Sequence, residues 1–250
     1  MLCAQRVDRF SDDAVVLSTV DYGDTHRIAA LFTRTHGRLG AFAAGARASR
    51  RRFAGALEPG TLLRCRLVAR RGDTVRLDGV DVLDSFHRVR GELSRIARML
   101  YALELCRELT REREVHAGLF DALVDFLRRL DGGAAGPTAL LELELSALHH
   151  AGLRPCFSPC AACGGALHER PRFSPQAGGA VCEACALRLP GAAPLAPELV
   201  AALAGLQAGA RAPLPHDVRQ RGRELLSSFI GYHLGRRLNS ASFLEHVGAG

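Results

Sequence analysis

The chain has 250 residues, of which 48% are hydrophobic, and a formal net charge of +7. This hydrophobic content excludes an intrinsically disordered chain, and the length suits one large domain or two to three small ones. All 33 basic residues are arginine. The lack of lysine excludes the ordinary forms of Walker-type phosphate loops, protein-kinase ATP sites and Schiff-base enzymes, because each of them needs a lysine.

The positive charge is concentrated near the N-terminus. Residues 1–90 contain 16 arginines and 10 acidic residues, whereas residues 91–250 contain 17 arginines and 16 acidic residues. Between Thr25 and Gly72, eleven arginines stand beside a single acid, Glu58. Because crowded like charges repel one another, a polyanion such as a nucleic acid is the simplest partner for this segment.

The expected cellular location follows from the first residues and from the cysteines. Residues 1–13 carry charges and no apolar segment, so we expect no signal peptide. No run of about 18 apolar residues predicts a membrane span. The eight cysteines are then expected to be reduced, in a cytoplasmic protein without a membrane partner.

Alternating apolar residues predict five β-strands in the basic N-terminal part. They are expected at residues 14–20, 26–33, 38–44, 61–70 and 75–82. The inward phase of the last strand slips by one residue at Gly79, with Val80 and Val82 inward after it, which indicates a β-bulge. Five short strands fit a small, partly open barrel of the OB type. An SH3-like barrel is the alternative, because the number of strands does not separate the two.

The arginines of this region fall on a loop and on one face of the predicted sheet. The loop at residues 45–53 carries four of them, and others alternate with apolar residues along the fourth strand. Guanidinium groups bind phosphate oxygens in bidentate geometry. Phe53, at the end of the loop, is expected either to stack on a base or to anchor the loop to the barrel. The predicted DNA-binding residues are Arg34, Arg38, Arg47, Arg50, Arg51, Arg52, Phe53, Arg64, Arg66 and Arg70.

This arginine surface has a competing interpretation. A charged loop is often only a solvated segment without a ligand. If the surface does bind nucleic acid, little sequence specificity is expected, because nothing in the segment indicates readout of base edges.

After Arg90 the apolar period becomes that of helices. We expect helices over residues 91–114, around an apolar stripe at 119–130, and over 137–151, 197–208 and 217–238. Residues 154–194 are rich in proline, glycine and cysteine and are predicted to be a loop.

Four cysteines in that loop form two C-x-x-C pairs. Cys160 and Cys163 are separated by 18 residues from Cys182 and Cys185. Each pair presents two thiolates to one ion, so together they predict a tetrahedral, structural Zn²⁺ site. An iron site or a pair of disulfides is the alternative, and Cys156 is a candidate substitute ligand.

A metalloenzyme is disfavoured by the same pattern. Residues 159–163 match the P-C-x-x-C half of the nucleobase deaminase signature. A site closed by four thiolates, however, leaves no position for a reacting water. No catalytic residue is predicted.

The predicted fold is therefore α+β with more than one domain. Residues 1–86 form an OB-type barrel, residues 87–250 form a helical domain, and residues 154–190 are a zinc-binding insertion within it.

The order of these parts resembles the RecO family of bacterial DNA repair and recombination mediators, over nearly the whole chain. Short stretches carry the resemblance: Tyr22-Gly23-Asp24-Thr25-His26-Arg27-Ile28, residues 31–39, Gly45-Ala46-Arg47 with Ser49-Arg50, Leu57-Glu58-Pro59, the cysteine quartet with Gly178-Gly179, and residues 233–244. The chain departs from the family at Asp24, where glutamate is usual, and has arginine or asparagine where lysine is usual.

The resemblance implies a non-enzymatic protein with an N-terminal OB barrel and a helical C-terminal domain. It implies binding of single- and double-stranded DNA, annealing of complementary strands, and interaction with RecR and the single-stranded-DNA-binding protein during loading of RecA at the nucleoid. By the same resemblance, the DNA-binding candidates are Arg34, Arg38, Arg47 and Arg50 to Arg52. A zinc-ribbon scaffold for RNA or protein is the alternative function.

Overall fold

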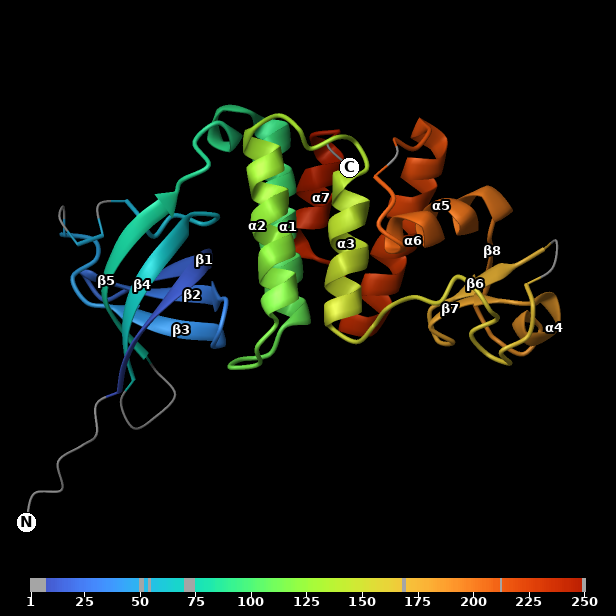
Figure 1. The fold of residues 1–250 in the computed structure, drawn as a ribbon, viewed down its shortest axis with the longest axis horizontal. Helices are drawn as coiled ribbons and strands as arrows, with labels where there is room; N and C mark the ends of the chain where they lie inside the picture. The colour runs from blue at the N-terminus through green and yellow to red at the C-terminus, as the bar shows by residue number, and fades with distance from the viewer. Residues whose placement is uncertain are drawn as a thin grey trace, which may run out of the picture. The chain divides into compact units, whose positions relative to one another are not determined.

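The structure is a computed structural model that describes residues 8–49, 52–53, 55–69, 75–167, 170–211 and 213–248. The chain forms two compact units, Met1–Gly132 and Gly133–Gly250. Figure 1 shows the strands and helices of each unit, coloured along the chain.

The first unit begins with a five-stranded barrel. Its strands are β1 (Asp8–Tyr22), β2 (His26–Thr33), β3 (Gly37–Ala43), β4 (Leu62–Ala69) and β5 (Val75–Asp84). They close in the order β1-β2-β3-β5-β4, with β3 and β5 parallel and the other neighbours antiparallel. This Greek-key order confirms the predicted OB type over the SH3-like alternative.

Strand β1 is longer than predicted because it pairs with two neighbouring strands. Its first half pairs with β4 and its second half with β2, and the register shifts between Val16 and Ser18. A bulge of this kind bends a strand, which allows one strand to turn the corner of a barrel. The first half was missed because polar residues, among them the buried Asp12, interrupt the apolar pattern.

Strand β5 carries the predicted bulge. Arg66 of β4 pairs with Gly79, whereas the next residue, Leu67, pairs with Leu77, so one residue of β5 is left over. A Cβ atom at Gly79 would lie 2.5 Å from Nη2 of Arg66, so the guanidinium occupies the space above the glycine. The prediction that Val82 faces inward is wrong, because 51% of it is exposed.

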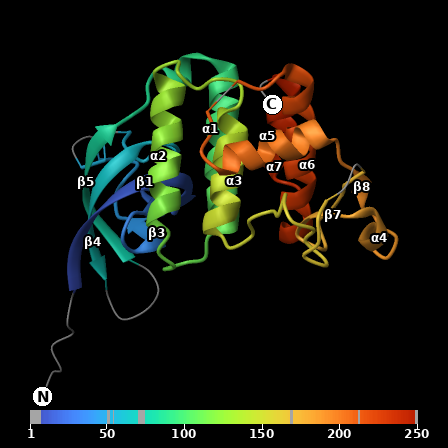
Figure 2. The same ribbon diagram turned by 45° about the vertical axis from the view of Figure 1, so that its right-hand side comes forward.

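Two helices of the first unit pack beside the barrel, α1 (Leu93–Leu109) and α2 (Ala117–Asp131), preceded by a 3-10 turn at Val89–Gly91. Phe120 of α2 meets Phe32 of β2 edge to face, with ring centroids 5.8 Å apart. Figures 1 and 2 both show α1 and α2 side by side. The predicted domain boundary at residues 86 and 87 separates the barrel from these helices, although they pack with it as one compact unit.

The second unit is mainly helical. It contains α3 (Ala139–His150), α4 (Glu183–Ala186), α5 (Pro197–Gln207), α6 (His216–Leu234) and α7 (Asn239–His246). The helix predicted over residues 217–238 is confirmed as α6, but its predicted end is wrong, since α6 ends at Leu234. Gly235 has a φ of +69°, the left-handed conformation that ends helices and that glycine adopts without strain.

The cysteine-rich segment is more ordered than the predicted loop. It forms a three-stranded sheet in the order β7-β6-β8, from β6 (Arg172–Ser174), β7 (Gly179–Val181) and β8 (Ala193–Pro194). Strands of two or three residues are too short to produce an apolar period, so the sequence pattern did not indicate them. Among the described residues, no helix is long and apolar enough to cross a membrane.

Candidate nucleic-acid interface and metal centre

The outer face of β4 carries two of the predicted DNA-binding arginines. Arg64 and Arg66 are exposed, whereas Leu63, Cys65 and Leu67 between and beside them are buried in the barrel. The alternation predicted from the sequence is therefore confirmed for this strand. Burial raises the pKa of the Cys65 thiol to about 12, so it is an inert core residue.

Both arginines are paired with acids from the neighbouring strands. Arg64 donates two hydrogen bonds to the Asp13 carboxylate of β1, at 2.8 and 3.1 Å. Arg66 donates to Asp81 of β5 at 2.5 Å. The hydrogen bonds and the charge of Asp13 raise the pKa of Arg64 above its ordinary value.

Arg34 and Arg38 lie at the turn between β2 and β3. Arg34 donates two hydrogen bonds of 3.0 Å to Asp121 of α2, and this interaction raises its pKa. Arg38 is half-buried, and its Nε has no hydrogen-bond partner among the described residues. The main chain at Arg38 is held by Arg113, whose N–H donates to the Arg38 carbonyl at 3.0 Å.

The loop after β3 holds the remaining described candidates. Arg47 donates to the Asp24 carbonyl at 3.2 Å and lies 3.6 Å from Asp21, and Arg52 donates to the Ala44 carbonyl at 2.8 Å. These interactions order the loop and leave both side chains at the surface. The predicted Arg50, Arg51 and Arg70 lie outside the described residues.

Phe53 belongs to the barrel core. Only 2% of it is exposed, and it joins the cluster of apolar side chains that fills the barrel. The guanidinium carbon of Arg52 lies 5.3 Å from the centre of its ring. A buried ring cannot stack on a base, so the structure favours the anchor interpretation of Phe53 over base stacking.

The arginine surface is thus less positive than the sequence count indicates. The partner acids come from outside the basic segment, from positions 13, 21, 81 and 121. More than half of the Arg34, Arg64 and Arg66 side chains is nevertheless exposed. Surface ion pairs of this kind add little stability, so a phosphate can replace the carboxylate without disrupting the fold.

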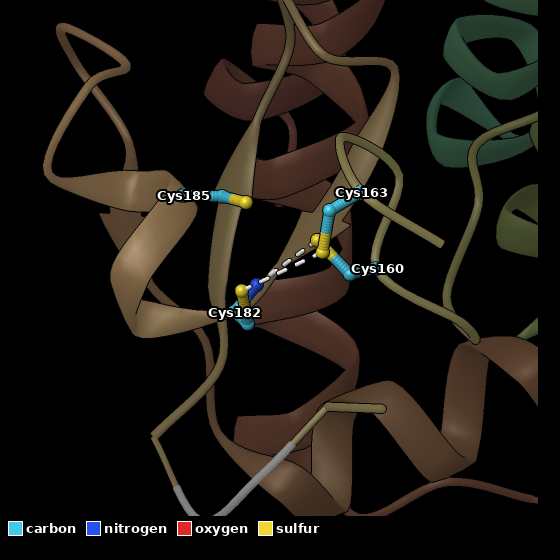
Figure 3. A group of neighbouring side chains, drawn as sticks. All are labelled: Cys160, Cys163, Cys182 and Cys185. Atoms are coloured by element: carbon cyan, nitrogen blue, oxygen red, sulfur yellow. Dashed lines mark hydrogen bonds between the residues drawn. The ribbon is translucent and has the colours of Figure 1, made fainter. Parts of the chain in front are cut away.

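The four predicted metal-ligating cysteines lie together in the second unit (Figure 3). The sulfur atoms of Cys160, Cys163, Cys182 and Cys185 are all within 4.8 Å of one another. The Sγ atoms of Cys163 and Cys182 are 4.0 Å apart. A tetrahedral zinc site with Zn–S bonds of about 2.3 Å has sulfur atoms about 3.8 Å apart. The donor set therefore fits a four-thiolate zinc ion.

Main-chain N–H groups beside the cluster favour the thiolate form of Cys160. The N–H of Cys182 donates to Sγ of Cys160 at 3.3 Å. Burial opposes ionisation of Cys160, but this N–H and those of Cys163 and Ala162 outweigh it and lower its pKa to about 6. Hydrogen bonding within the cluster raises the pKa of Cys185 to about 12. Four neighbouring thiolates need a cation to be ionised together, as a divalent metal would allow.

Glycines permit the tight backbone around this centre. Gly164 follows the first C-x-x-C pair with a φ of +73°. Gly179 lies against the main chain of Cys156, where a Cβ atom would collide. Cys156 itself donates its thiol proton to the Pro159 carbonyl at 3.2 Å and is not one of the four clustered cysteines.

The chain also contains the upstream half of a deaminase signature, Cys106-Arg107-Glu108 in α1. Cys106 is fully buried and burial raises its pKa to about 12. It takes no part in the cysteine cluster. The structure therefore gives this match no role in a metal site.

Comparison with known proteins matches both parts of the chain to one family. Residues 7–86 match the family described as Recombination protein O N terminal, and residues 90–242 match Recombination protein O C terminal. The DNA repair protein RecO of Myxococcus xanthus is 56% identical over 242 residues, which is 97% of this chain and 99% of that protein. The protein of the same name from Anaeromyxobacter sp. is 46% identical, over 97% of this chain and 98% of that protein. The one from Geobacter sulfurreducens is 38% identical, over 94% of this chain and 97% of that protein.

Proposed function

Because the chain belongs to the RecO family of recombination proteins, we propose that it is a non-enzymatic DNA repair mediator. It binds single- and double-stranded DNA through the arginines of its barrel and anneals complementary strands. With RecR it helps to load RecA onto DNA covered by the single-stranded-DNA-binding protein. The observation that carries the proposal is the match of both family domains to the two parts of the chain.

The exposed arginines of β4 and of the β2–β3 turn support DNA binding. Each guanidinium now holds a carboxylate in the geometry that suits a phosphate, with two hydrogen bonds at Arg34 and at Arg64. Exchange of carboxylate for phosphate keeps the hydrogen bonds of the guanidinium. Arginines that neutralise the phosphates of two strands lower their mutual repulsion, so pairing needs no ATP.

The metal centre supports the fold of the second unit. The ion, when bound, supplies four bonds that tie the 160–163 turn to the segment at 182–185. With four thiolates around it, no position is open for a substrate, so its role is structural. The same metal centre is the basis of the alternative function, in which the chain is a zinc-ribbon scaffold that binds RNA or protein.

The test is binding of a fluorescent oligonucleotide over a salt series, with and without its complement. Changing Arg50, Arg51 and Arg52 together to alanine is expected to weaken binding equally across sequences. The slope of log K against log salt falls by about 2, at about 0.7 for each single-strand phosphate that is no longer neutralised. Annealing of the complement slows in parallel.

A matched control removes three exposed arginines of the second unit, Arg154, Arg188 and Arg211, by the same change. This control has the same net charge and retains the barrel loop. Equal losses in both variants would refute binding at the barrel. Unchanged affinity and salt slope in the loop variant would refute binding through the loop arginines. Competition by RNA stronger than by DNA of the same length and sequence favours the scaffold.

A further inference from the structure

One member of the cysteine cluster lies at the surface of the second unit. Cys163 is exposed, whereas Cys182 is half-buried and Cys160 is buried. The Sγ atoms of Cys163 and Cys182 belong to different C-x-x-C pairs and lie 4.0 Å apart (Figure 3). The thiolate is the reactive form of cysteine, and a metal keeps its cysteine ligands in this form. An oxidant that reaches Cys163 therefore meets two thiolates side by side.

The other cysteines that the structure describes are poorer targets for an oxidant. Cys65 and Cys106 are buried, and burial raises the pKa of each thiol to about 12. Cys156 is half-buried, and its thiol donates to the Pro159 carbonyl at 3.2 Å. Susceptibility to oxidation follows thiolate character and exposure. Both criteria select Cys163.

The insertion around the cluster has only a small apolar core. Its buried residues are Cys160, Val181, Ala186 and Ala192, and all four side chains are small. The strands β6, β7 and β8 contain only two or three residues each. A segment of this kind depends on its metal for folding, because the free energy of metal binding is also free energy of folding. Loss of metal ligands is therefore expected to loosen the insertion.

The insertion packs against the helices of the same unit through aromatic rings. Phe173 of β6 meets Phe229 of α6 edge to face, with ring centroids 5.5 Å apart. It also stacks on Phe157, with centroids 6.2 Å apart. A cavity of about 810 Å³ along this boundary is lined by Phe173 together with Leu199 of α5 and Leu225 of α6. A change in the insertion therefore reaches the wall of this cavity.

We propose that the cysteine quartet is a site of reversible oxidation by hydroperoxides, with a disulfide between Cys163 and Cys182 as the product. The Cys163 thiolate attacks one oxygen of hydrogen peroxide, which breaks the O–O bond, forms a sulfenic acid and releases hydroxide. The Cys182 thiolate then attacks this sulfur, forms the S–S bond and displaces a second hydroxide. The two sulfur atoms together lose two electrons, and the peroxide gains both.

This oxidation dismantles the metal centre. Only Cys160 and Cys185 remain as thiolates, and two thiolates do not complete the four ligands of a structural zinc site. The zinc is then released, the insertion loosens, and the wall of the cavity beside Phe173 changes. A dithiol reductant breaks the disulfide by thiol exchange, so that added zinc restores the site.

The test exposes the full-length, zinc-loaded protein to hydrogen peroxide and follows released zinc with a chromophoric chelator. We expect zinc release and the loss of two cluster thiols in the same time course, while Cys65 and Cys106 stay reduced. Dithiothreitol with added zinc is expected to restore the bound metal. The matched control is Cys156→Ser, which removes a neighbouring cysteine that is not in the quartet and is expected to release zinc at the wild-type rate.

Digestion with trypsin shows which cysteines are joined. Trypsin cuts after arginine but not before proline, so residues 130–172 and 173–188 form separate peptides, each with one C-x-x-C pair. A disulfide between Cys163 and Cys182 links the two peptides, whereas a disulfide within either pair does not. Mass spectrometry without reduction is expected to detect the linked peptides in the wild type and in Cys156→Ser.

Hydrogen exchange provides a readout of the structural consequence. After oxidation, amide exchange is expected to rise over residues 156–188 and in the part of α6 around Phe229, and to return to its initial level after reduction with zinc. Exchange in the barrel strands is expected to stay unchanged, because the cluster lies in the second unit.

Four results would overturn the inference. The first is retention of zinc under peroxide exposure that fully oxidises free cysteine in solution. The second is zinc release with disulfides only within the C-x-x-C pairs, and the third is loss of the linked peptides in Cys156→Ser, since each of these excludes the bond between Cys163 and Cys182. The fourth is unchanged hydrogen exchange after zinc release. Zinc, thiols and peptides are measured without DNA, so these results are independent of the proposed DNA-binding function.

Discussion

Replacing both Asp13 and Asp81 by asparagine is expected to strengthen DNA binding. These carboxylates hold Arg64 and Arg66 on the outer face of β4. Asparagine has nearly the same shape and still accepts a hydrogen bond from the arginine, so the barrel stays folded. The change removes two negative charges that compete with phosphates and would repel them at this surface.

The size of the effect follows from the number of released guanidiniums. In the wild type the displaced carboxylate keeps its negative charge beside each arginine, so the pair neutralises no net phosphate charge. In the variant each guanidinium neutralises one phosphate of a single strand, and the slope of log K against log salt steepens by about 1.4, at about 0.7 per phosphate. Between 50 and 200 mM salt, a slope difference of this size changes the affinity ratio of variant to wild type by about sevenfold. The advantage of the variant is therefore largest at low salt.

Fluorescence anisotropy over a salt series measures both the affinity and the slope. The matched control is Asp217→Asn with Glu245→Gln, which frees Arg221 and Arg237 of the second unit and adds the same charge. A slope unchanged from wild type would show that Arg64 and Arg66 do not bind DNA. The same change of slope in the control would show that only net charge matters.

Three further perturbations test the barrel and the metal centre. Phe53→Ala is expected to lower the free energy of unfolding by about 3–5 kcal/mol, measured by urea denaturation, because it empties a buried site; unchanged stability would contradict the anchor role. Burial opposes ionisation of Asp12, but hydrogen bonds from His36 and Thr35 outweigh it and lower its pKa below 3.8. Its contribution is therefore present above about pH 4 and lost as pH falls through the folded pKa. Asp12→Asn should reduce stability by about 1–3 kcal/mol at pH 7 and remove this part of the acid dependence; a variant as acid-sensitive as wild type would refute the assignment. Chelation of the metal should increase amide hydrogen exchange over residues 156–188 while DNA affinity is retained; loss of binding with the fold intact would contradict a structural role.

Local patterns in the sequence were enough to predict much of the fold. The alternation along β4 indicated which side chains enter the barrel, and the phase slip at Gly79 indicated the bulge. The spacing of two C-x-x-C pairs indicated the thiol cluster before any geometry was available. These features depend on residues close together in sequence, or on a ligand chemistry with a fixed spacing, so the sequence alone can determine them.

Interactions between distant residues needed the tertiary structure. Asp121 is 87 positions from Arg34, and Asp13 is 51 positions from Arg64, so no local charge count reveals these pairs. The burial of Phe53 depends on how its loop closes over the barrel, which its neighbours in sequence do not specify. Tyr22, Gly40 and Phe42 become one surface only when β1, β2 and β3 pair in register. The sequence alone thus determined that the N-terminal part is a small five-stranded barrel and which four cysteines cluster. Strand order decided that the barrel is of the OB type, and strand pairing decided which charges and rings are available to a ligand.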